Sequence, residues 1–496
     1  MSDTAPHSSS PKYLRLEPDD APPLLNCFLF AIQHLLTMIP ATVAVPILIA
    51  NELHLQPPEA RRFISAVLIS MGLATLLQVR FGTRLPLIQG SAFAFIPAMY
   101  LIARHTTGLE GLRCISGALL LASVIQFGIG FTGLVGLVRR IFSPIVTGPV
   151  ILVIGLSLFH VGAAKAGQNW IIAGLTISLV FIFAYGGERL LRGRLRLIFR
   201  TLPVLLTISI VSAISWGLLR IGVLGADTTS SNSIAVFRDV PWNEVALLPF
   251  HWLPPIFSLS FFVATLAATL AATVDSIGNF HACTQVCRLP NPSAEQLNKG
   301  VALLGLTSTL AALLGGLGNT VYSENLGLVQ ITRVASRRVM LWTGALVLLA
   351  GLWTKAGALL LAIPSSIMGG LYCILFGMIA GTGLQIIASA KPTPRDAAIM
   401  GFTTFMGLAV PFYIQQTPQL PEQLSFLAIG EMIVALGGTG VAVTAFLGIL
   451  LDNLLPRRAT LPEQSSAAIV LLPGPTRPPG AVNGAAPKDQ GDKDLK

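Results

Sequence analysis

The chain has 496 residues, of which 53% are hydrophobic and 11% are charged, and its mean hydropathy is +0.73. A soluble domain carries about 25% charged residues, so this deficit excludes a soluble globular enzyme of this length. A net charge of +10 would favour a nucleic-acid partner in a soluble protein. Here the basic residues lie in short loops between apolar runs, which indicates orientation in a lipid bilayer and no nucleic-acid partner.

Apolar runs close to the roughly 20 residues of a membrane-spanning helix recur from one end of the chain to the other. Backbone polar groups in lipid must be satisfied within the segment, so these runs predict helices and an all-α polytopic membrane protein. We expect fourteen spans, at 25–50, 63–79, 85–103, 113–137, 142–164, 169–186, 202–223, 257–283, 299–317, 319–335, 338–361, 365–390, 396–414 and 428–451.

Three polar segments divide the chain. Residues 1–21 lack the apolar region of a cleavable signal peptide and predict a disordered cytoplasmic N-terminus, and residues 456–496 predict a disordered cytoplasmic tail. Residues 225–256 predict an extracytoplasmic linker between a first set of seven spans at 22–224 and a second set at 257–455.

Basic residues are unequally shared between alternate loops. One set of loops carries Arg80, Arg84, Arg139, Arg140, Arg189, Arg192, Arg194, Arg196, Arg200, Arg288, Lys299, Arg333, Arg337, Arg338, Lys391 and Arg395, whereas the other carries Arg61, Arg62, Arg104, Lys165 and Arg238. The richer set is expected in the cytoplasm. Both termini should therefore lie inside, with the protein in the plasma or inner membrane. Lys355, late in span eleven, is expected to extend toward the membrane interface.

Seven is an odd number, so the second set of spans enters the membrane in the opposite sense, which is the condition for an inverted repeat. The third span of each set is interrupted. Span three reads RLPLIQGSAFAFIP and span ten reads GNTVYSENLGLVQITR. Their glycine, proline, β-branched and aromatic residues predict a short extended segment before a half-helix. Interrupted spans at matching places in two halves indicate a binding site near the membrane midplane.

Ionisable residues deep in a span indicate function by default. Asp275 lies inside span eight and Glu324 in the interrupted span ten. The alternative for each is a structural carboxylate that ties helices together. Asn279 is four residues after Asp275, on the same helical face. Gln33 and His34 form a polar pair in span one that can bridge helices by hydrogen bonds.

These residue types suit a flat nitrogen base. Carboxylates accept hydrogen bonds from N–H groups, and backbone N–H groups at the start of a half-helix donate to carbonyls. The ring of Phe93 is the candidate for stacking on the flat face of the base. A carboxylate in a dry cavity favours its protonated form. Asp275 and Glu324 are thus candidates for binding the base and for carrying a proton with it.

At these residues the chain resembles the nucleobase–ascorbate transporters, also called uracil–xanthine permeases, over roughly 25–455. The most specific match is Glu324-Asn325-x-Gly327-x4-Thr332-Arg333, which looks like the family signature. Gln33-His34 matches the first-span pair, Gly90-Ser91-Ala92-Phe93 resembles the third-span motif, and VDSIGN at 274–279 resembles the eighth-span motif.

The resemblance implies a core domain of spans 1–4 and 8–11 and a gate domain of spans 5–7 and 12–14. It implies substrate between spans three and ten, bound by Asp275, Glu324, Phe93, Asn325 and Ala92. The supporting set for proton coupling is Glu324, Asp275, Gln33, His34, Asn279 and Thr332. It also implies proton symport, with Na⁺ as the alternative ion, and a homodimer.

The branch of the family is not settled by these motifs. Span eight usually carries Glu where this chain has Asp275, and purine members commonly have Asp at the place of Asn279. Glu324 is typical of the uracil branch, since purine members often have Gln there and ascorbate members usually have Pro. The surrounding VDSIGNFHA is more similar to the purine branch.

Four alternatives to a uracil carrier remain. The first is a xanthine, urate or guanine permease, and the second is an anion carrier of the same architecture, against which two site carboxylates argue. The third is a membrane enzyme, but the chain has no nucleophile–base set, HExxH or phosphate loop. The fourth is a passive channel. We expect a transporter with no enzymatic activity, no metal and no cofactor.

Overall fold

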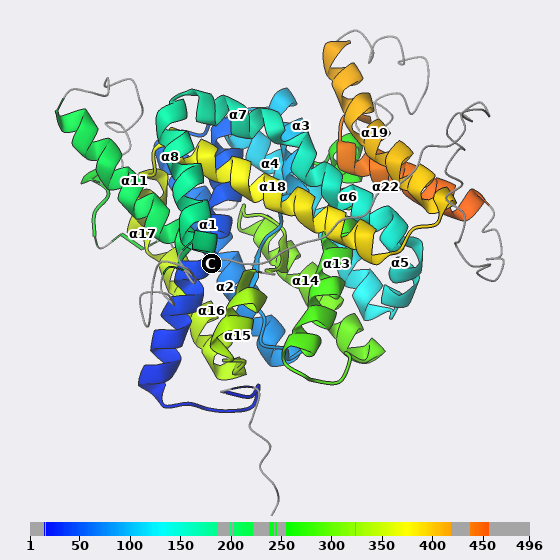
Figure 1. Ribbon diagram of the computed structural model, residues 1–496, viewed down its shortest axis with the longest axis horizontal. Coiled ribbons are helices and arrows are strands. Elements are labelled where there is room, and N and C mark those ends of the chain that lie inside the picture. The colour runs from blue at the N-terminus through cyan, green and yellow to red at the C-terminus, as the bar shows by residue number, and fades with distance from the viewer. Residues whose placement is uncertain are drawn as a thin grey trace, which may run out of the picture. The chain divides into compact units, whose positions relative to one another are not determined.

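The structure is a computed structural model that describes residues 14, 16–186, 199, 202–221, 238–242, 244–245, 254–322, 324–417 and 437–455. The predicted tail at 456–496, most of the predicted linker and the first part of span fourteen lie outside these residues. The described chain is mostly helical (Figure 1). Six of its helices are long and apolar enough to cross a membrane.

The elements follow in this order: α1 (Leu24–Glu52), α2 (Pro57–Phe81), β1 (Gln89–Ser91), η1 (Phe93–Phe95), α3 (Ile96–His105), α4 (Gly108–Phe131), α5 (Val135–Ile141), α6 (Pro144–Ser157), α7 (Phe159–Gly167), α8 (Trp170–Phe181), α11 (Pro203–Arg220), α13 (Leu259–Val286), α14 (Ala294–Leu313), β2 (Asn319–Val321), α15 (Glu324–Thr332), α16 (Arg337–Leu352), α17 (Thr354–Leu361), α18 (Ser365–Ser389), α19 (Pro394–Gln416) and α22 (Gly440–Leu454).

Reciprocal side-chain caps begin several of these helices. In α14 the Ser293 hydroxyl accepts from the Gln296 backbone N–H, while the Gln296 side chain accepts from the Ser293 N–H. Thr393 and Asp396 form the same capping box at α19. Such pairs satisfy backbone donors that a helix start leaves open, so each boundary is encoded locally.

Strands β1 and β2 form a two-stranded antiparallel sheet, with Gln89 opposite Val321, Gly90 opposite Thr320 and Ser91 opposite Asn319. Each strand is followed closely by a helix, α3 after β1 and α15 after β2. All six strand residues are buried. The pairing satisfies backbone groups of an extended segment that could not otherwise remain away from water.

The helices pack in two main sets of contacts. In one, α4 packs on α14 and α13, and α2 packs on α16 and α14. In the other, α18 lies along α6, α7 and α8, while α22 contacts α19 and α6 (Figure 1). Small residues allow the close approach: a Cβ added at Gly130 or Gly305 would meet backbone of the facing helix, as expected for helices packed in lipid.

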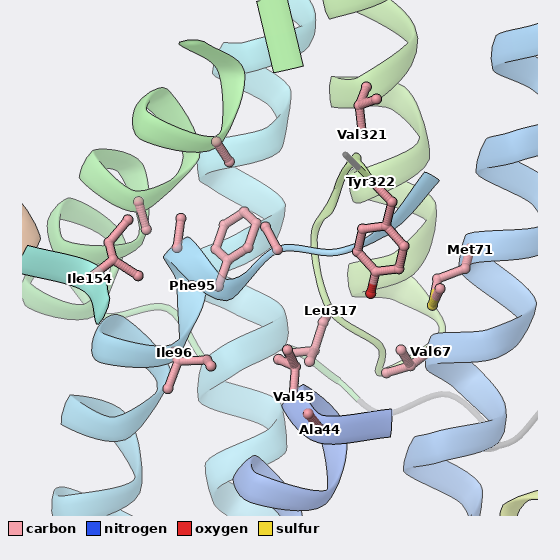
Figure 2. Close-up of a cluster of buried hydrophobic side chains, with 14 of the residues drawn as sticks. Ala44, Val45, Val67, Met71, Phe95, Ile96, Ile154, Leu317, Val321 and Tyr322 are labelled. Carbon is pink, nitrogen blue, oxygen red and sulfur yellow. The ribbon is translucent and has the colours of Figure 1, made fainter. Parts of the chain in front are cut away.

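A buried apolar cluster surrounds the strand pair. Figure 2 shows Phe95 and Tyr322 in this cluster together with Val45 from α1, Met71 from α2 and Ile154 from α6. Phe95 and Tyr322 are each 2% exposed or less. The cluster therefore joins the two halves of the sequence around the strands.

Residues 16–20, which the sequence assigns to the disordered N-terminus, are ordered against the connection between α15 and α16. Leu16 donates its N–H to the Arg333 carbonyl at 3.2 Å and accepts from the Ala335 N–H at 2.9 Å. Asp19 pairs with Arg337 at 2.5 Å. Leu16 thus forms an isolated parallel β-bridge with Val334, and a turn at residues 18–19 follows it.

Lys355 is 2% exposed and does not extend into the interface as expected. Its Nζ donates to the Val240 carbonyl at 2.6 Å and lies 4.8 Å from the centre of the Trp242 ring. The Trp353 indole also donates to the Trp242 carbonyl, at 3.0 Å. The expectation was wrong because part of the linker folds over this lysine and supplies the partners that water would otherwise provide.

Candidate functional site

The predicted site residues lie around the strand pair. Ala92 and Phe93 directly follow β1, and Glu324 begins α15 after β2. The Ala92 N–H donates to the Gly318 carbonyl at 3.3 Å, so the end of β1 is held to the residue before β2. Phe93 is half-buried and starts the turn that leads into α3. The side chain of Glu324 lies outside the described part of the structure.

A serine that the sequence argument did not single out attaches α13 to this strand pair. The Ser276 hydroxyl lies 2.9 Å from the Thr320 hydroxyl and accepts from the Val321 N–H at 3.4 Å. Ser276 is fully buried. Ser276 belongs to the VDSIGN motif and directly follows Asp275 in the sequence, which is the signal that could have identified it. It fixes the height of Asp275 relative to β2.

Asp275 and Asn279 meet at the edge of β2. The Asn279 amide donates to the Asp275 carboxylate and to the Val321 carbonyl, at 3.3 Å in both cases. Both side chains are half-buried, and residues four apart share one face of a helix. The structure therefore brings Asp275 and Asn279 together beside β2, the strand that precedes Glu324 and Asn325.

His34 and Asn325 form the second polar contact. The Asn325 amide nitrogen and the His34 Nδ1 are 3.1 Å apart, and each residue is 1% exposed. The Asn325 Oδ1 is buried without a hydrogen-bond partner among the described residues. This contact joins α1 to the first turn of α15, as the polar pair in span one suggested.

Two members of the predicted supporting set, Gln33 and Thr332, lie outside the two polar contacts just described. Gln33 is half-buried next to His34 on α1. Thr332 ends α15, where its hydroxyl donates to the Leu328 carbonyl at 2.9 Å and accepts from the Val334 N–H at 3.3 Å. Both hydrogen bonds lie within the turn that ends the helix, and the following residue Arg333 has a φ of 58°. Thr332 therefore shapes the exit from the half-helix.

Tyr322 closes the strand pair on the side of Gly90. Its hydroxyl donates to the Ser91 carbonyl at 3.3 Å, and its N–H donates to the Ile88 carbonyl at 3.0 Å. A Cβ at Gly90 would overlap the Tyr322 ring. A glycine here leaves room for the aromatic ring, which Figure 2 shows within the buried apolar cluster.

Apolar helices of membrane-crossing length, around a small polar site at two short antiparallel strands, define a membrane transporter. Solved structures share this fold. The transmembrane domain of a cyanobacterial bicarbonate transporter, BicA, matches with a TM-score of 0.52 and 14% identity, covering 80% of this chain and 98% of that one. Murine Slc26a9, an anion transporter, matches with a TM-score of 0.57 and 11% identity, covering 87% and 68%.

Sequence comparison is more specific. The Permease family model Xan_ur_permease matches residues 25–416. Solute carrier family 23 member 2 of Rattus norvegicus is 31% identical, covering 88% of this chain and 74% of the relative. Nucleobase-ascorbate transporter 1 of Arabidopsis thaliana is also 31% identical, covering 80% of each. The chain belongs to the nucleobase–ascorbate, or uracil–xanthine, permease family. These relatives are transporters and not enzymes.

Proposed function

We propose that the protein is a secondary active transporter that imports a uracil-like or xanthine-like base together with a proton. The observation that carries the proposal is the contact of Asp275 with Asn279, which in turn reaches the Val321 carbonyl of β2. This contact links a carboxylate on α13 to the end of β2, which the candidate residue Glu324 follows in the chain. This is the arrangement that a base with edge N–H groups needs for acceptors and for a stacking ring.

The proposed architecture is fourteen spans in a 7+7 inverted repeat. The strand register supports it, because a two-fold rotation about Gly90 and Thr320 exchanges Gln89 with Asn319. The preceding helices repeat the same contact. The Gln89 N–H donates to the Thr75 hydroxyl of α2 at 2.9 Å, and the Asn319 N–H donates to the Ser308 hydroxyl of α14 at 3.0 Å. Local detail is thus matched between the two halves.

The proposed core domain combines spans 1–4 and 8–11, and the proposed gate domain combines spans 5–7 and 12–14. The contacts of α4 with α13 and α14, and of α2 with α16, fall within the first group. Those of α18 with α6 and α7, and of α19 with α22, fall within the second. One ion pair and one hydrogen bond add to the second group, since Arg395 binds Asp452 at 3.1 Å and the Ser143 hydroxyl donates to the same carboxylate at 2.9 Å.

Ascorbate is the second candidate, because the plant relatives are named nucleobase-ascorbate transporters. Ascorbate is an anion at neutral pH. Two carboxylates, Asp275 and Glu324, would repel it unless a cation accompanied it. A neutral base that donates N–H groups to the same carboxylates meets no such repulsion. The site chemistry therefore favours a nucleobase and also predicts that ascorbate transport, if found, requires a cation such as Na⁺.

The deciding experiment is uptake of labelled uracil, xanthine, urate, guanine and ascorbate in cells lacking their own permeases. We expect saturable accumulation of a base that stops with a protonophore and continues without sodium. Asp275→Asn at matched surface expression is the negative control. Accumulation of ascorbate alone would overturn the substrate assignment, and accumulation that needs sodium but survives the protonophore would reassign the ion.

We further propose that the protein resides in the plasma or inner membrane as a homodimer with both termini in the cytoplasm. Exposed aromatic residues on α19 are consistent with a lipid or partner surface. These are Phe402, Phe405, Phe412 and Tyr413. Cross-linking of two differently tagged copies in native membranes tests the dimer, and failure to recover one tag with the other contradicts it.

A further inference from the structure

Two half-helices from different parts of the fold meet through aromatic rings. Tyr100 of α3 and His160 of α7 contact edge to face, with 5.6 Å between ring centres and an angle of 80°. The Arg104 guanidinium lies 5.2 Å from the centre of the Tyr100 ring. Phe159 packs on His160 in the same edge-to-face manner, at 5.7 Å. None of the site residues described above belongs to this cluster.

The cluster lies where each span is interrupted. Tyr100 is about two helical turns after Phe93, in the half-helix that follows β1. His160 lies just after Leu158, whose φ of −101° and ψ of 8° separate α6 from α7 within one span. Glu52, at the end of α1, interacts with the Tyr100 hydroxyl from the same end of the bundle. The three elements end on the side that loop charges assign to the extracytoplasmic space.

From this geometry we propose that the contact between Tyr100 and His160 is the extracytoplasmic gate of the transport path, which closes the site from the outside when α3 and α7 meet. The proposal rests on the proposed division into core and gate domains, since α3 belongs to the first and α7 to the second. Separating these helices would open a route toward Phe93 from that side.

The contact is suited to opening and closing because one contribution to its free energy is favourable and another is unfavourable. An edge-to-face aromatic pair is favourable beyond its buried area. Against it, the His160 Nε2 is buried without a hydrogen-bond partner among the described residues. A buried nitrogen without a hydrogen-bond partner costs free energy. Water that reaches the nitrogen on opening would supply the missing hydrogen bond and remove this cost. Two arrangements of comparable stability are what a ligand needs in order to shift between them.

Ile154 provides a reporter for the test. It is 4% exposed and belongs to α6, and it reaches the cluster that contains Phe95 (Figure 2). In a variant whose five native cysteines are replaced, Ile154→Cys is treated on intact cells with a membrane-impermeant maleimide. We expect slow labelling, and labelling about two- to tenfold faster after Tyr100→Ala or His160→Ala, since an aromatic pair is worth roughly that change in an equilibrium. Tyr100→Phe keeps the ring and removes only the hydroxyl that Glu52 contacts. It therefore separates the ring contact from the contact with Glu52, and we expect a rate close to that of the parent.

Inside-out vesicles provide the opposite arm: the same alanine variants should label more slowly there, because the outward-facing population has grown. Equal rates for parent and alanine variants from both sides would overturn the proposal, and faster labelling from both sides would show loosened packing and also overturn it. Labelling uses no substrate, so this result is independent of which base is carried.

A second experiment covers variants that fail to reach the surface. Tyr100→Cys and His160→Cys are combined and treated with a bifunctional methanethiosulfonate, with each single variant as the control. We expect uptake of labelled uracil, xanthine or ascorbate, whichever the parent accumulates, to be lost in the double variant and regained with dithiothreitol. Full uptake while the two positions are cross-linked would contradict the gate.

Discussion

At the scale of single residues, amide groups make the visible contacts of the site. Asn279 donates to Asp275 and to the Val321 carbonyl, and Asn325 contacts His34. Each amide therefore fixes the position of a titratable group without adding charge. The acids are then free to bind and release what the transporter carries, and their replacement should affect transport more than folding.

Glu324→Gln is the most direct test of this idea. The amide keeps the shape of the side chain but cannot exchange a proton, and it offers one fixed acceptor. We expect normal insertion and a loss of uracil uptake corresponding to about 1–3 kcal/mol, as for removal of a hydrogen bond to a charged group. Asp275→Asn should be at least as damaging. Uptake of uracil and xanthine is measured side by side at matched surface expression.

A gain of xanthine uptake in Glu324→Gln would indicate that residue 324 selects between the bases, since purine members of the family often carry Gln there. If uptake of every base and its pH dependence stay unchanged, Glu324 is a structural carboxylate and the site assignment is wrong.

At the scale of elements, the strand pair is the most demanding part of the fold. Ser276, Thr75 and Ser308 bind its backbone from three helices. Tyr322 covers it where Gly90 leaves room. An error in one of these contacts moves Ala92 and Phe93 relative to Glu324, so the stability of the strands and the geometry of the site are linked.

Gly90→Ala tests the close approach of Tyr322. The new methyl group would overlap the ring, so the strand or the ring must shift, at a cost of about 1–3 kcal/mol typical of overpacking. Gly128→Ala is the matched control, because a Cβ there meets nothing within 4 Å. We expect a lower midpoint of thermal unfolding in detergent for Gly90→Ala alone. Equal midpoints for the two variants would show that the ring yields freely.

The N-terminal segment gives a second test at this scale. The pair of Arg337 with Asp19 has side-chain exposures of 33% and 82%, and such exposed pairs contribute about 0–1 kcal/mol. The backbone bonds of Leu16 and the 2.6 Å bond from Ser336 to the Asp20 carbonyl are better shielded. Deleting residues 14–20 should therefore lower the thermal midpoint clearly, whereas Asp19→Ala should change it little. The reverse order would mean that the charge pair holds this segment.

At the scale of the whole molecule, loop charges make a prediction that no single contact makes. Because the Arg-rich loops alternate with poorer ones, both termini should face the cytoplasm. Tags at the two ends should resist an impermeant protease on intact cells and become sensitive after permeabilisation. Cleavage of either tag from outside would reverse the orientation, and with it the side assigned to the contact between Tyr100 and His160.

The apolar runs correctly predicted a mostly helical membrane protein, because the apolar character of a helix and its capping residues depend on neighbouring positions in the sequence. The partners across the fold were not predictable in this way. Ser91 and Tyr322 are 231 positions apart, and no local pattern specifies their contact. Lys355 was placed wrongly for the same reason, since its partner Val240 lies in a polar segment that gave no sign of folding back. Asp275 and Asn279 were found together because helical spacing is local.

The strand pair also constrains how the protein is made. When the ribosome has completed β1, its partner β2 does not yet exist, and the extended backbone of Gln89–Ser91 has no strand to bind. Unpaired backbone groups are costly inside a bilayer, and long-range pairing is slow to form. The first half of the chain should therefore wait, incompletely folded and dependent on the insertion machinery or chaperones, until the second half has been synthesised. Two half-chains produced separately should each be degraded, yet protect one another when they are produced in the same cell.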